Sequence, residues 1–340
     1  MPVAEKALIA QIRRLAAGRA GQYLAGGSAR ATRSNPAIVA GIGDDCAVLR
    51  LPPGREFLVT TDFSLEGVHF RRDWHPPESA GHRCLARGLS DIAAMGGEPV
   101  AAFLSLALPR NLPQVWVEKF LRGLIGLAGK FGVSLAGGDT AESPNGILAD
   151  IVVVGTVPKG TAILRSGARP GDRIYVSGEL GGSASALQQL RLQGRKKAQR
   201  KLNPAEYPRH FFPEPRIELG RILRKKGLAS AMIDTSDGLS TDLTHICEEC
   251  GVGAEVEAET IPRARVDKPA HEVALELALH GGEDYELLFT APRNQKIPSR
   301  IAGVQITEIG HITRTRKILL RNRSGGVHHL KPQGWEHFRH

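Results

Sequence analysis

The chain has 340 residues, 41% hydrophobic and 24% charged, a balance typical of a folded protein with a sizeable core. At roughly 100–200 residues per domain, this length predicts about two domains. The 39 glycines follow no Gly-X-Y period, which excludes a collagen-like fibre. No apolar run approaches the roughly 18–20 residues of a membrane helix, and the N-terminus lacks the apolar core of a signal peptide. Four cysteines make no disulfide framework, so we expect a soluble, cytoplasmic protein.

The charge balance is basic, with 45 Lys and Arg against 35 Asp and Glu, a formal net charge of +10. Such a balance fits nucleic acid, small anionic substrates or solubility alone. Part of it is concentrated in six basic residues with no acid between them: Arg191, Arg195, Lys196, Lys197, Arg200 and Lys201. No aromatic residue interleaves them, so we interpret this stretch as a solvated surface insertion rather than a nucleic-acid contact.

Predicted strands and helices alternate along the first half of the chain. In order they are a strand at 57–61 that ends at Asp62, a helix at 80–93, a strand at 100–108, a helix at 117–128, and strands at 133–136 and 147–157. Gly96-Gly97 is expected to end the first helix and Gly132 the second. Asp150 and Gly155 interrupt the last apolar strand.

Residues 165–172 are rich in turn-forming residues and predict a hinge between two halves. Beyond them we expect a strand at 173–177, the basic stretch, a proline-rich passage to Pro215, a helix at 217–223, a strand at 229–233 and a helix carrying Leu239, Leu243, Ile246 and Cys247. The sequence therefore predicts two domains of mixed α/β class, over residues 1–158 and 159–340.

Acidic residues recur at predicted strand ends and glycine-rich turns. They are Asp44 and Asp45 in GIGDDC, Asp62 in TTDF, Asp91 in LSDIAAMGG, Asp139 in GGDT, Asp234 and Asp237 in IDTSDG, and Glu283 and Asp284 in GGEDYE. Each alone has a structural interpretation; Asp237, for example, is a good N-cap for the next helix. Because loops at sheet ends converge in α/β folds, the whole set favours a site at which Mg²⁺ or Mn²⁺ neutralises the carboxylates and holds phosphates.

Several known motifs are absent from the sequence. There is no G-x-x-x-x-G-K-[ST] phosphate loop, no complete dinucleotide fingerprint, no protein-kinase set and no G-x-S-x-G elbow. The pair Cys247 and Cys250 has no second pair that would complete a zinc site.

Six motifs in register resemble the thiamine-monophosphate kinase family of the aminoimidazole-ribonucleotide-synthetase-like ATP-binding superfamily. They are GIGDDCAVL, LVTTDFSLEGVHF, LARGLSDIAAMGGEP, AGGDT, IDTSDGLSTDL and GGEDYELLFT. The resemblance covers about residues 38–290, with a further match at Gly334-Trp335. It implies an N-terminal α+β domain that pairs with its copy in a dimer barrel, a C-terminal α/β domain, and ATP-dependent phosphorylation of thiamine monophosphate with several Mg²⁺ ions.

The resemblance also implies roles for particular residues. The metal positions would be Asp45, Thr60, Thr61, Asp62, Asp91, Asp139, Asp234 and Asp237. ATP would contact Gly138, Asp139, Arg165 and Ser236, and the acceptor would contact His69, Glu283 and Trp335. His69 and Arg165 suit phosphate groups, and Trp335 offers a flat face to a cationic thiazolium. A surface turn for His69 and tail packing for Trp335 are the structural alternatives.

The acceptor itself argues against a protein general base. The nucleophile would be an oxygen of a phosphate monoester, whose second pKa is about 6, so no proton has to be removed near neutral pH. We therefore expect direct in-line transfer. Two other functions remain open: a different ATP-dependent synthetase of the same superfamily, and a basic RNA-associated protein on this fold. Intact carboxylates in all six motifs favour the kinase. The basic stretch and the proline-rich passage are longer than the family needs.

Overall fold

A computed structural model describes residues 5–16, 35–42, 46–195, 203–266, 270–336 and 338. The chain divides into two compact units. The first comprises Met1–Ile92 and Glu98–Gly160, and the second comprises Ala93–Gly97 and Thr161–His340. Asp45 and the basic residues from Lys196 to Lys201 lie outside the described residues. Among the described residues, no helix has the length and apolar character needed to cross a lipid bilayer.

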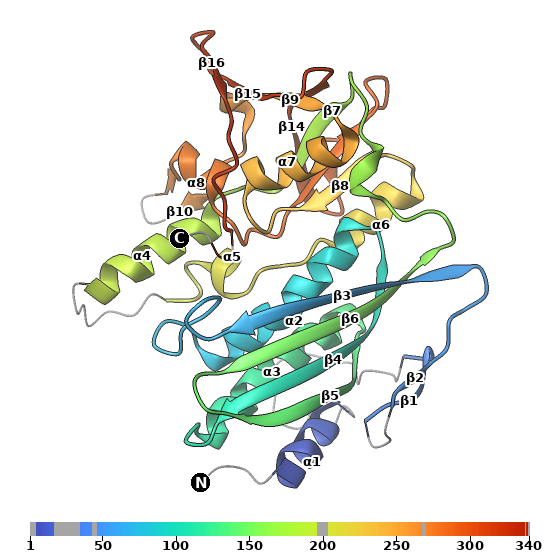
Figure 1. Cartoon of the computed structure of the whole chain (residues 1–340), viewed down its shortest axis with the longest axis vertical. Helices are drawn as coiled ribbons and strands as arrows, with labels where there is room; N and C mark the ends of the chain where they lie inside the picture. Colours follow the sequence, from blue (N-terminus) through green and yellow to red (C-terminus); the bar gives the residue numbers. More distant parts are fainter. Residues whose placement is uncertain are drawn as a thin grey trace. The chain divides into compact units, whose positions relative to one another are not determined.

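The first unit is built on a four-stranded sheet in the order β3-β6-β4-β5. The strands are β3 (Arg55–Leu65), β6 (Leu148–Pro158), β4 (Glu98–Pro109) and β5 (Ser134–Ser143). Only the β4–β5 pair is parallel. Helices α2 (Pro77–Ala94) and α3 (Gln114–Phe131) lie along one face of the sheet (Figure 1). The remaining elements are α1 (Glu5–Ala16), β1 (Ile38–Ala40) and β2 (Val48–Leu49).

Local sequence explains both long helices of this unit. The buried side of α3 carries apolar residues at helical spacing, and Gly132 ends it in a left-handed conformation whose N–H bonds to Ala128 O and Gly129 O. Two glycines allow α2 and α3 to pack closely. A Cβ at Gly81 would lie 1.9 Å from Phe120 O, and one at Gly123 would lie 1.9 Å from Glu78 O. Both predicted helices are confirmed, with longer bounds.

The second unit is built on a larger, mostly antiparallel sheet in the order β16-β15-β9-β14-β7-β12-β8, with β13 paired to β14. Its strands are β7 (Arg173–Ser177), β8 (Ala231–Asp234), β9 (Gly253–Glu257), β12 (Leu287–Ala291), β13 (Arg300–Ile301), β14 (Val304–Thr313), β15 (Ile318–Arg321) and β16 (Val327–His329). A separate ribbon pairs β10 (Arg265–Val266) with β11 (His271–Glu272).

Helix α7 (Leu239–Cys250) packs against this sheet, and the second unit has further helical segments (Figure 1). They are α4 (Gly182–Arg195), α5 (Pro208–Phe211), α6 (Ile217–Lys225), α8 (Leu275–His280) and the short 3₁₀ turns η2 (Arg165–Gly167) and η3 (Ala258–Thr260). One apolar core joins the sheet to α7 through fully buried residues such as Ile174, Leu243 and Leu288. The mixed α/β class predicted for both halves is confirmed.

Three local predictions differ from the structure. Strand β3 continues past Thr61 to Leu65, so Asp62 lies inside a strand. Strand β5 continues to Ser143, which places Asp139 inside a strand rather than in a turn. Residues 165–172, expected as a hinge, belong to the second unit, where Asp172 accepts hydrogen bonds from Arg169 N–H and Ser230 Oγ–H. In each case pairing with a distant segment outweighs local turn propensity.

Candidate active site

In the first unit, an acidic cluster lies between β3 and α2. Thr60 donates its hydroxyl hydrogen bond to Asp91 Oδ2, which joins the strand to the helix. The carboxylate of Asp62 lies 3.9 Å from Arg87 Nε. Burial, and next the negative charge of Asp91, raise the pKa of Asp62 to about 7. The two carboxylates therefore repel each other more strongly than Arg87 compensates, which is the electrostatic condition that a divalent cation relieves.

A second acidic group occupies the other face of the same sheet. Thr61, next to Thr60 but pointing to the opposite side, donates a hydrogen bond of 2.7 Å to Asp150 Oδ1. The strand register pairs Ser105 with both Asp150 and Asp139, and residues paired in this way share a face. The structure thus separates Asp139 and Thr61 from Thr60, Asp62 and Asp91.

Asp150 is the acidic residue that the sequence interpretation did not select. The sequence contains a feature that could have identified it. Asp150 interrupts the apolar run of β6, where a charged side chain needs a partner or a function. Among the described residues, no three His, Cys, Asp or Glu side chains form a group arranged to hold a metal ion. The donors that the structure does bring together, carboxylate and hydroxyl oxygens, are those that suit Mg²⁺.

Gly138 shows why the GGDT motif needs its second glycine. Its φ is 146°, and a Cβ there would lie 1.8 Å from Leu104 O on the neighbouring strand. A side chain at this position would force β5 away from β4. The next residue, Asp139, is exposed, and its carboxylate accepts the N–H of Thr140 at 2.8 Å.

In the second unit, three motifs far apart in the sequence meet. Asp234 ends β8, and the loop after it carries Ser236 and Asp237. Glu283 N–H bonds to Ser236 O at 2.8 Å, and Trp335 N–H bonds to Asp237 O at 3.0 Å. The structure thus brings Ser236, Asp237, Glu283 and Trp335 to one place. Glu283 holds a positive φ of 66°, a strained conformation that the surrounding contacts maintain.

The expected N-cap of α7 is wrong. Gly238, not Asp237, precedes the first turn, and its N–H bonds at 3.0 Å to the carboxylate of Asp242 inside the helix. Burial, followed by the charges of Asp234 and Asp237, raises the pKa of Asp242 well above its usual range. The cap of α7 is therefore made by the Asp242 carboxylate and not by Asp237.

Two buried acids support the GGEDYE loop from behind. Asp284 accepts the N–H groups of Gly181 at 2.6 Å and Ser183 at 3.1 Å, at the start of α4. Glu286 accepts hydrogen bonds from Arg216 Nε at 2.7 Å and Ser177 Oγ at 2.5 Å. Burial raises the pKa of Asp284 to about 7. These contacts fix the backbone on either side of Tyr285.

Two remaining candidate residues occupy distinct places. His69 lies in a turn after β3, where its Nδ1 accepts the N–H of Leu65 at 3.0 Å. Arg165 is exposed in η2, and its carbonyl accepts the thiol of Cys250 near the C-terminal end of α7. Ser236 and Asp237 precede the other end of this helix, whose 12 residues span about 18 Å. Within the second unit, Arg165 is therefore not brought to the Ser236–Asp237 loop.

Two family models match the chain, in agreement with its two units. Residues 43–157 match the N-terminal domain of AIR synthase related proteins, and residues 169–321 match the C-terminal domain. The thiamine-monophosphate kinase of Escherichia coli strain K12 is 40% identical over 310 residues, which cover 88% of this chain and 91% of that protein.

Solved structures agree with these sequence matches. A thiamine-monophosphate kinase from Stenotrophomonas maltophilia K279a superposes with a TM-score of 0.76 at 33% identity, over 94% of this chain and 97% of that one. A structure described as AaThiL complexed with AMPPCP and TMP gives a TM-score of 0.73 at 32% identity, over 85% and 89% of the two chains. The chain belongs to the thiamine-monophosphate kinase family.

Proposed function

We propose that this enzyme phosphorylates thiamine monophosphate to thiamine diphosphate with ATP as the phosphoryl donor. The observation that carries the proposal is the meeting of Ser236–Asp237, Glu283 and Trp335 in a chain whose relatives bear that activity as their name. A related structure, by its description, holds AMPPCP, an ATP analogue, together with TMP. Both ligands are phosphate esters, which suits the basic net charge of the chain.

The acceptor would bind through His69, Glu283 and Trp335, and ATP through Gly138, Asp139 and Ser236. The position of Arg165 at the other end of α7 does not favour the contact with ATP expected of it. Trp335 is 48% exposed, so one face of its ring is accessible to a cationic thiazolium. The carboxylate of Glu283 offers the aminopyrimidine end of the acceptor a charged hydrogen-bond acceptor. The backbone N–H groups of His69, Glu283 and Trp335 each donate a hydrogen bond to another backbone carbonyl, which holds these residues in place before substrate arrives.

Mg²⁺ fits the acidic residues that the structure brings together. We propose that Thr60, Asp62 and Asp91 hold one ion in the first unit. Thr61 and Asp139, on the other face of the sheet, would be oxygen donors to another ion, as would Asp45 from the segment outside the described residues. Asp234 and Asp237 would contribute from the second unit. When bound, Mg²⁺ neutralises phosphate charge during transfer. The raised pKa of Asp62 supports this assignment, because burial and the negative charge of Asp91 outweigh the attraction of Arg87.

Transfer would be in line and without a protein general base. The acceptor phosphate is mostly dianionic near neutral pH, since its second pKa is about 6. His69 fits a binding role, because its Nδ1 already accepts a backbone N–H and the neutral ring then carries its proton on Nε2. Such a ring donates a hydrogen bond to a phosphate and does not abstract a proton. The protein's contribution is alignment and charge stabilisation.

We also propose that the enzyme is a cytoplasmic homodimer. On the face of β3 away from the helices, Phe57, Val59 and Phe63 are 43%, 67% and 55% exposed. The β1–β2 ribbon packs against Val154 farther across this face and leaves these three side chains uncovered. A second copy of the chain would remove this apolar surface from water. The four free cysteines fit a reducing compartment.

The competing functions are weaker. A different synthetase of the superfamily would have to use the same acceptor-binding residues for another substrate, in a chain 40% identical to a thiamine-monophosphate kinase over 88% of its length. An RNA-associated role would depend on the basic stretch, of which only α4 up to Arg195 is described.

The decisive experiment measures ATP consumption by the purified chain with Mg²⁺, with and without thiamine monophosphate, and identifies the product by mass. We expect ADP and thiamine diphosphate in equal amounts, and little turnover without the acceptor. ATP consumption that does not depend on thiamine monophosphate, or a product other than the diphosphate, would refute the proposal.

A further inference from the structure

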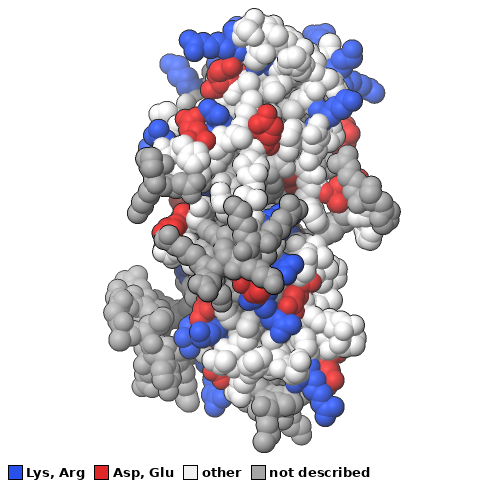
Figure 2. Space-filling view, turned by 90° about the vertical axis from the view of Figure 1, so that its left-hand side faces the viewer, with Lys and Arg blue, Asp and Glu red and all other residues white. Residues whose placement is uncertain are grey.

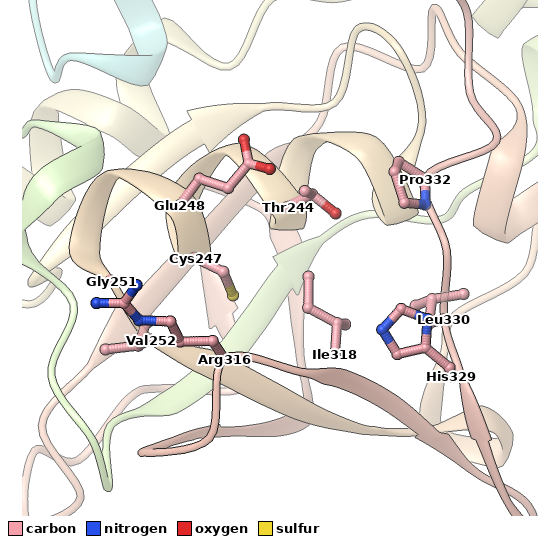
Figure 3. A pocket seen from close by; sticks show the side chains of 10 residues that line it. All are labelled: Thr244, Cys247, Glu248, Gly251, Val252, Arg316, Ile318, His329, Leu330 and Pro332. Carbon is pink, nitrogen blue, oxygen red and sulfur yellow. The ribbon is translucent and has the colours of Figure 1, made fainter.

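A cavity of about 450 Å³ lies in the second unit, at the C-terminal end of α7 (Figure 3). Its walls come from α7 and the two residues after it, from β15 and the turn before it, and from the end of β16 and the segment that follows. None of the residues that line it is a candidate active-site residue, and Ser236 and Asp237 precede the other end of α7. The volume falls within the range of about 300–1,000 Å³ that small-molecule sites occupy.

The floor of the cavity is apolar and well packed. Cys247, Val252, Ile318 and Leu330 line it, with 3%, 8%, 7% and 5% of their surface exposed. Burial raises the pKa of the Cys247 thiol to about 12, so this sulfur is a packing surface and not a nucleophile. Such a floor takes an aliphatic or aromatic body from water.

The rim of the cavity carries a guanidinium on one side and an imidazole on the other. Arg316 and His329 lie on opposite sides of it, with Cys247 and Ile318 between them (Figure 3). Both side chains are exposed, and among the described residues no carboxylate pairs with Arg316. Glu248 also lines the rim, but its carboxylate points away from the Arg316 guanidinium.

The chain around the cavity is also positively charged. Residues 310–335 contain six Lys and Arg and no Asp or Glu. Lys and Arg side chains also border the upper end of the surface in Figure 2, where Figure 1 places β15 and β16. Arg321 is neutralised by Glu255, whereas Arg314, Arg316 and Lys317 are exposed in one turn. A positive potential at the mouth of the cavity follows.

A purely structural role for Arg316 is the competing interpretation, because its guanidinium lies beside Gly251, the C-cap of α7. The last turn of that helix, however, already has its caps. Glu248 O accepts the N–H of Gly251 at 3.1 Å, and Cys247 O accepts the N–H of Val252 at 2.9 Å. The guanidinium is therefore not needed there to satisfy those carbonyls.

We propose that this cavity binds a small organic anion, in which a carboxylate or phosphate sits between Arg316 and His329 and an apolar body rests on Cys247, Ile318 and Leu330. The inference goes beyond the proposed kinase activity and does not depend on it, because the site shares no residue with the active site.

The test is calorimetric titration of the full chain, without nucleotide or Mg²⁺, by phenyl phosphate, benzoate, inorganic phosphate and benzyl alcohol. We expect phenyl phosphate or benzoate to bind in roughly the millimolar range that suits a fragment, and about tenfold more tightly than either half-molecule probe. The stronger of the two aromatic anions identifies whether the site prefers phosphate or carboxylate. Saturable binding of neither aromatic anion would overturn the proposal.

Variants locate the site. Arg316→Gln should weaken binding of the aromatic anion about tenfold, whereas Glu248→Gln should strengthen it about threefold. Arg314→Gln is the matched control, because it removes the same charge from the same turn without lining the cavity. It should change affinity less than about twofold. Equal effects of Arg316→Gln and Arg314→Gln, or no effect of either, would show diffuse attraction or binding elsewhere and would refute the site.

Discussion

Thr60 on β3 donates its hydroxyl hydrogen bond to Asp91 on α2, and so ties a sheet strand to a helix through a carboxylate that is not fully buried. A carboxylate whose only task was to hold this contact would not need Asp62 beside it. The raised pKa of Asp62 shows instead that two acids share one site. This arrangement is the physical basis for the first prediction.

Asp91→Asn should remove activity by several powers of ten at any Mg²⁺ concentration, because one negative charge that holds the metal is lost. The hydroxyl of Thr60 can still bond to the amide oxygen, so the thermal midpoint should change little. Steady-state kinetics and thermal denaturation measure both effects. Asp73→Asn, which alters an exposed carboxylate paired with Arg71, is the control and should keep full activity. Wild-type turnover in Asp91→Asn would contradict the metal assignment.

His69→Asn should raise the KM for thiamine monophosphate more than it lowers kcat. The Asn oxygen can replace Nδ1 as acceptor of the Leu65 N–H, while the donor at Nε2 is lost. Kinetics at several acceptor concentrations separate the two constants. A loss of turnover at unchanged acceptor affinity would instead make His69 a general base.

Asp284 should make stability depend on pH. Its pKa is about 7 in the folded protein against an ordinary 3.8, so between about pH 4 and 7 the folded state binds more protons than the unfolded state. The stability that this group contributes at low pH is lost as the pH rises through 7, by at most about 4 kcal/mol. Asp284→Asn, which resembles the neutral acid, should gain stability relative to the wild type between pH 5 and pH 8.

Urea denaturation at four pH values, without metal, measures that difference. Asp73→Asn provides the comparison again, because Arg71 lowers the pKa of Asp73 and its carboxylate stays ionised over this range. Its stability relative to the wild type should not vary with pH. A difference between Asp284→Asn and the wild type that stays constant from pH 5 to pH 8 would show that Asp284 ionises normally in the folded protein.

Val59→Glu should convert the proposed dimer to a monomer, because it places a charge on the apolar face of β3. Val115→Glu, on α3 and similarly exposed at 56%, should leave the dimer intact. Sedimentation velocity of the three proteins checks this. A wild-type chain that sediments as a monomer would refute the dimer itself.

Replacing Arg191, Arg195, Lys196, Lys197, Arg200 and Lys201 by Gln should leave both KM values within about threefold, while nonspecific binding to nucleic acid weakens and its salt dependence falls. These residues carry no glycine–carboxylate motif of the kind found at the site. A collapse of ATP affinity would show that the stretch contacts phosphates.

Periodicity and glycine positions predicted the elements of the first unit, since α2 and α3 bury one clear apolar side and end near glycines. The predicted ends of strands were wrong where pairing with a neighbouring strand, rather than local propensity, determines how far the strand continues. Asp62 resembles a turn residue in the sequence, but it pairs with Ile151 on the neighbouring strand β6, and β3 continues. Strand β14 had no such local signal, because the bulge between Glu308 and Gly310 breaks its alternation.

At the candidate site, motifs identified individual residues but not their arrangement. Thr60 and Thr61 are adjacent letters in the sequence, yet the pleat of β3 directs them to opposite faces, toward Asp91 and Asp150. That Trp335 meets Asp237 depends on the path of the chain after β16, which no local pattern encodes. Such contacts arise from tertiary structure alone.

Strand β7 of the second unit can complete its pairing only after two later strands have been synthesised. Val176 on β7 pairs with Leu288 on one side and Thr307 on the other. As the chain leaves the ribosome, β7 emerges long before either partner and waits with both edges open, while the first unit already has all four strands of its sheet. Nascent chains stalled before β12 should therefore be the species that chaperones bind and that aggregate when translation is slowed.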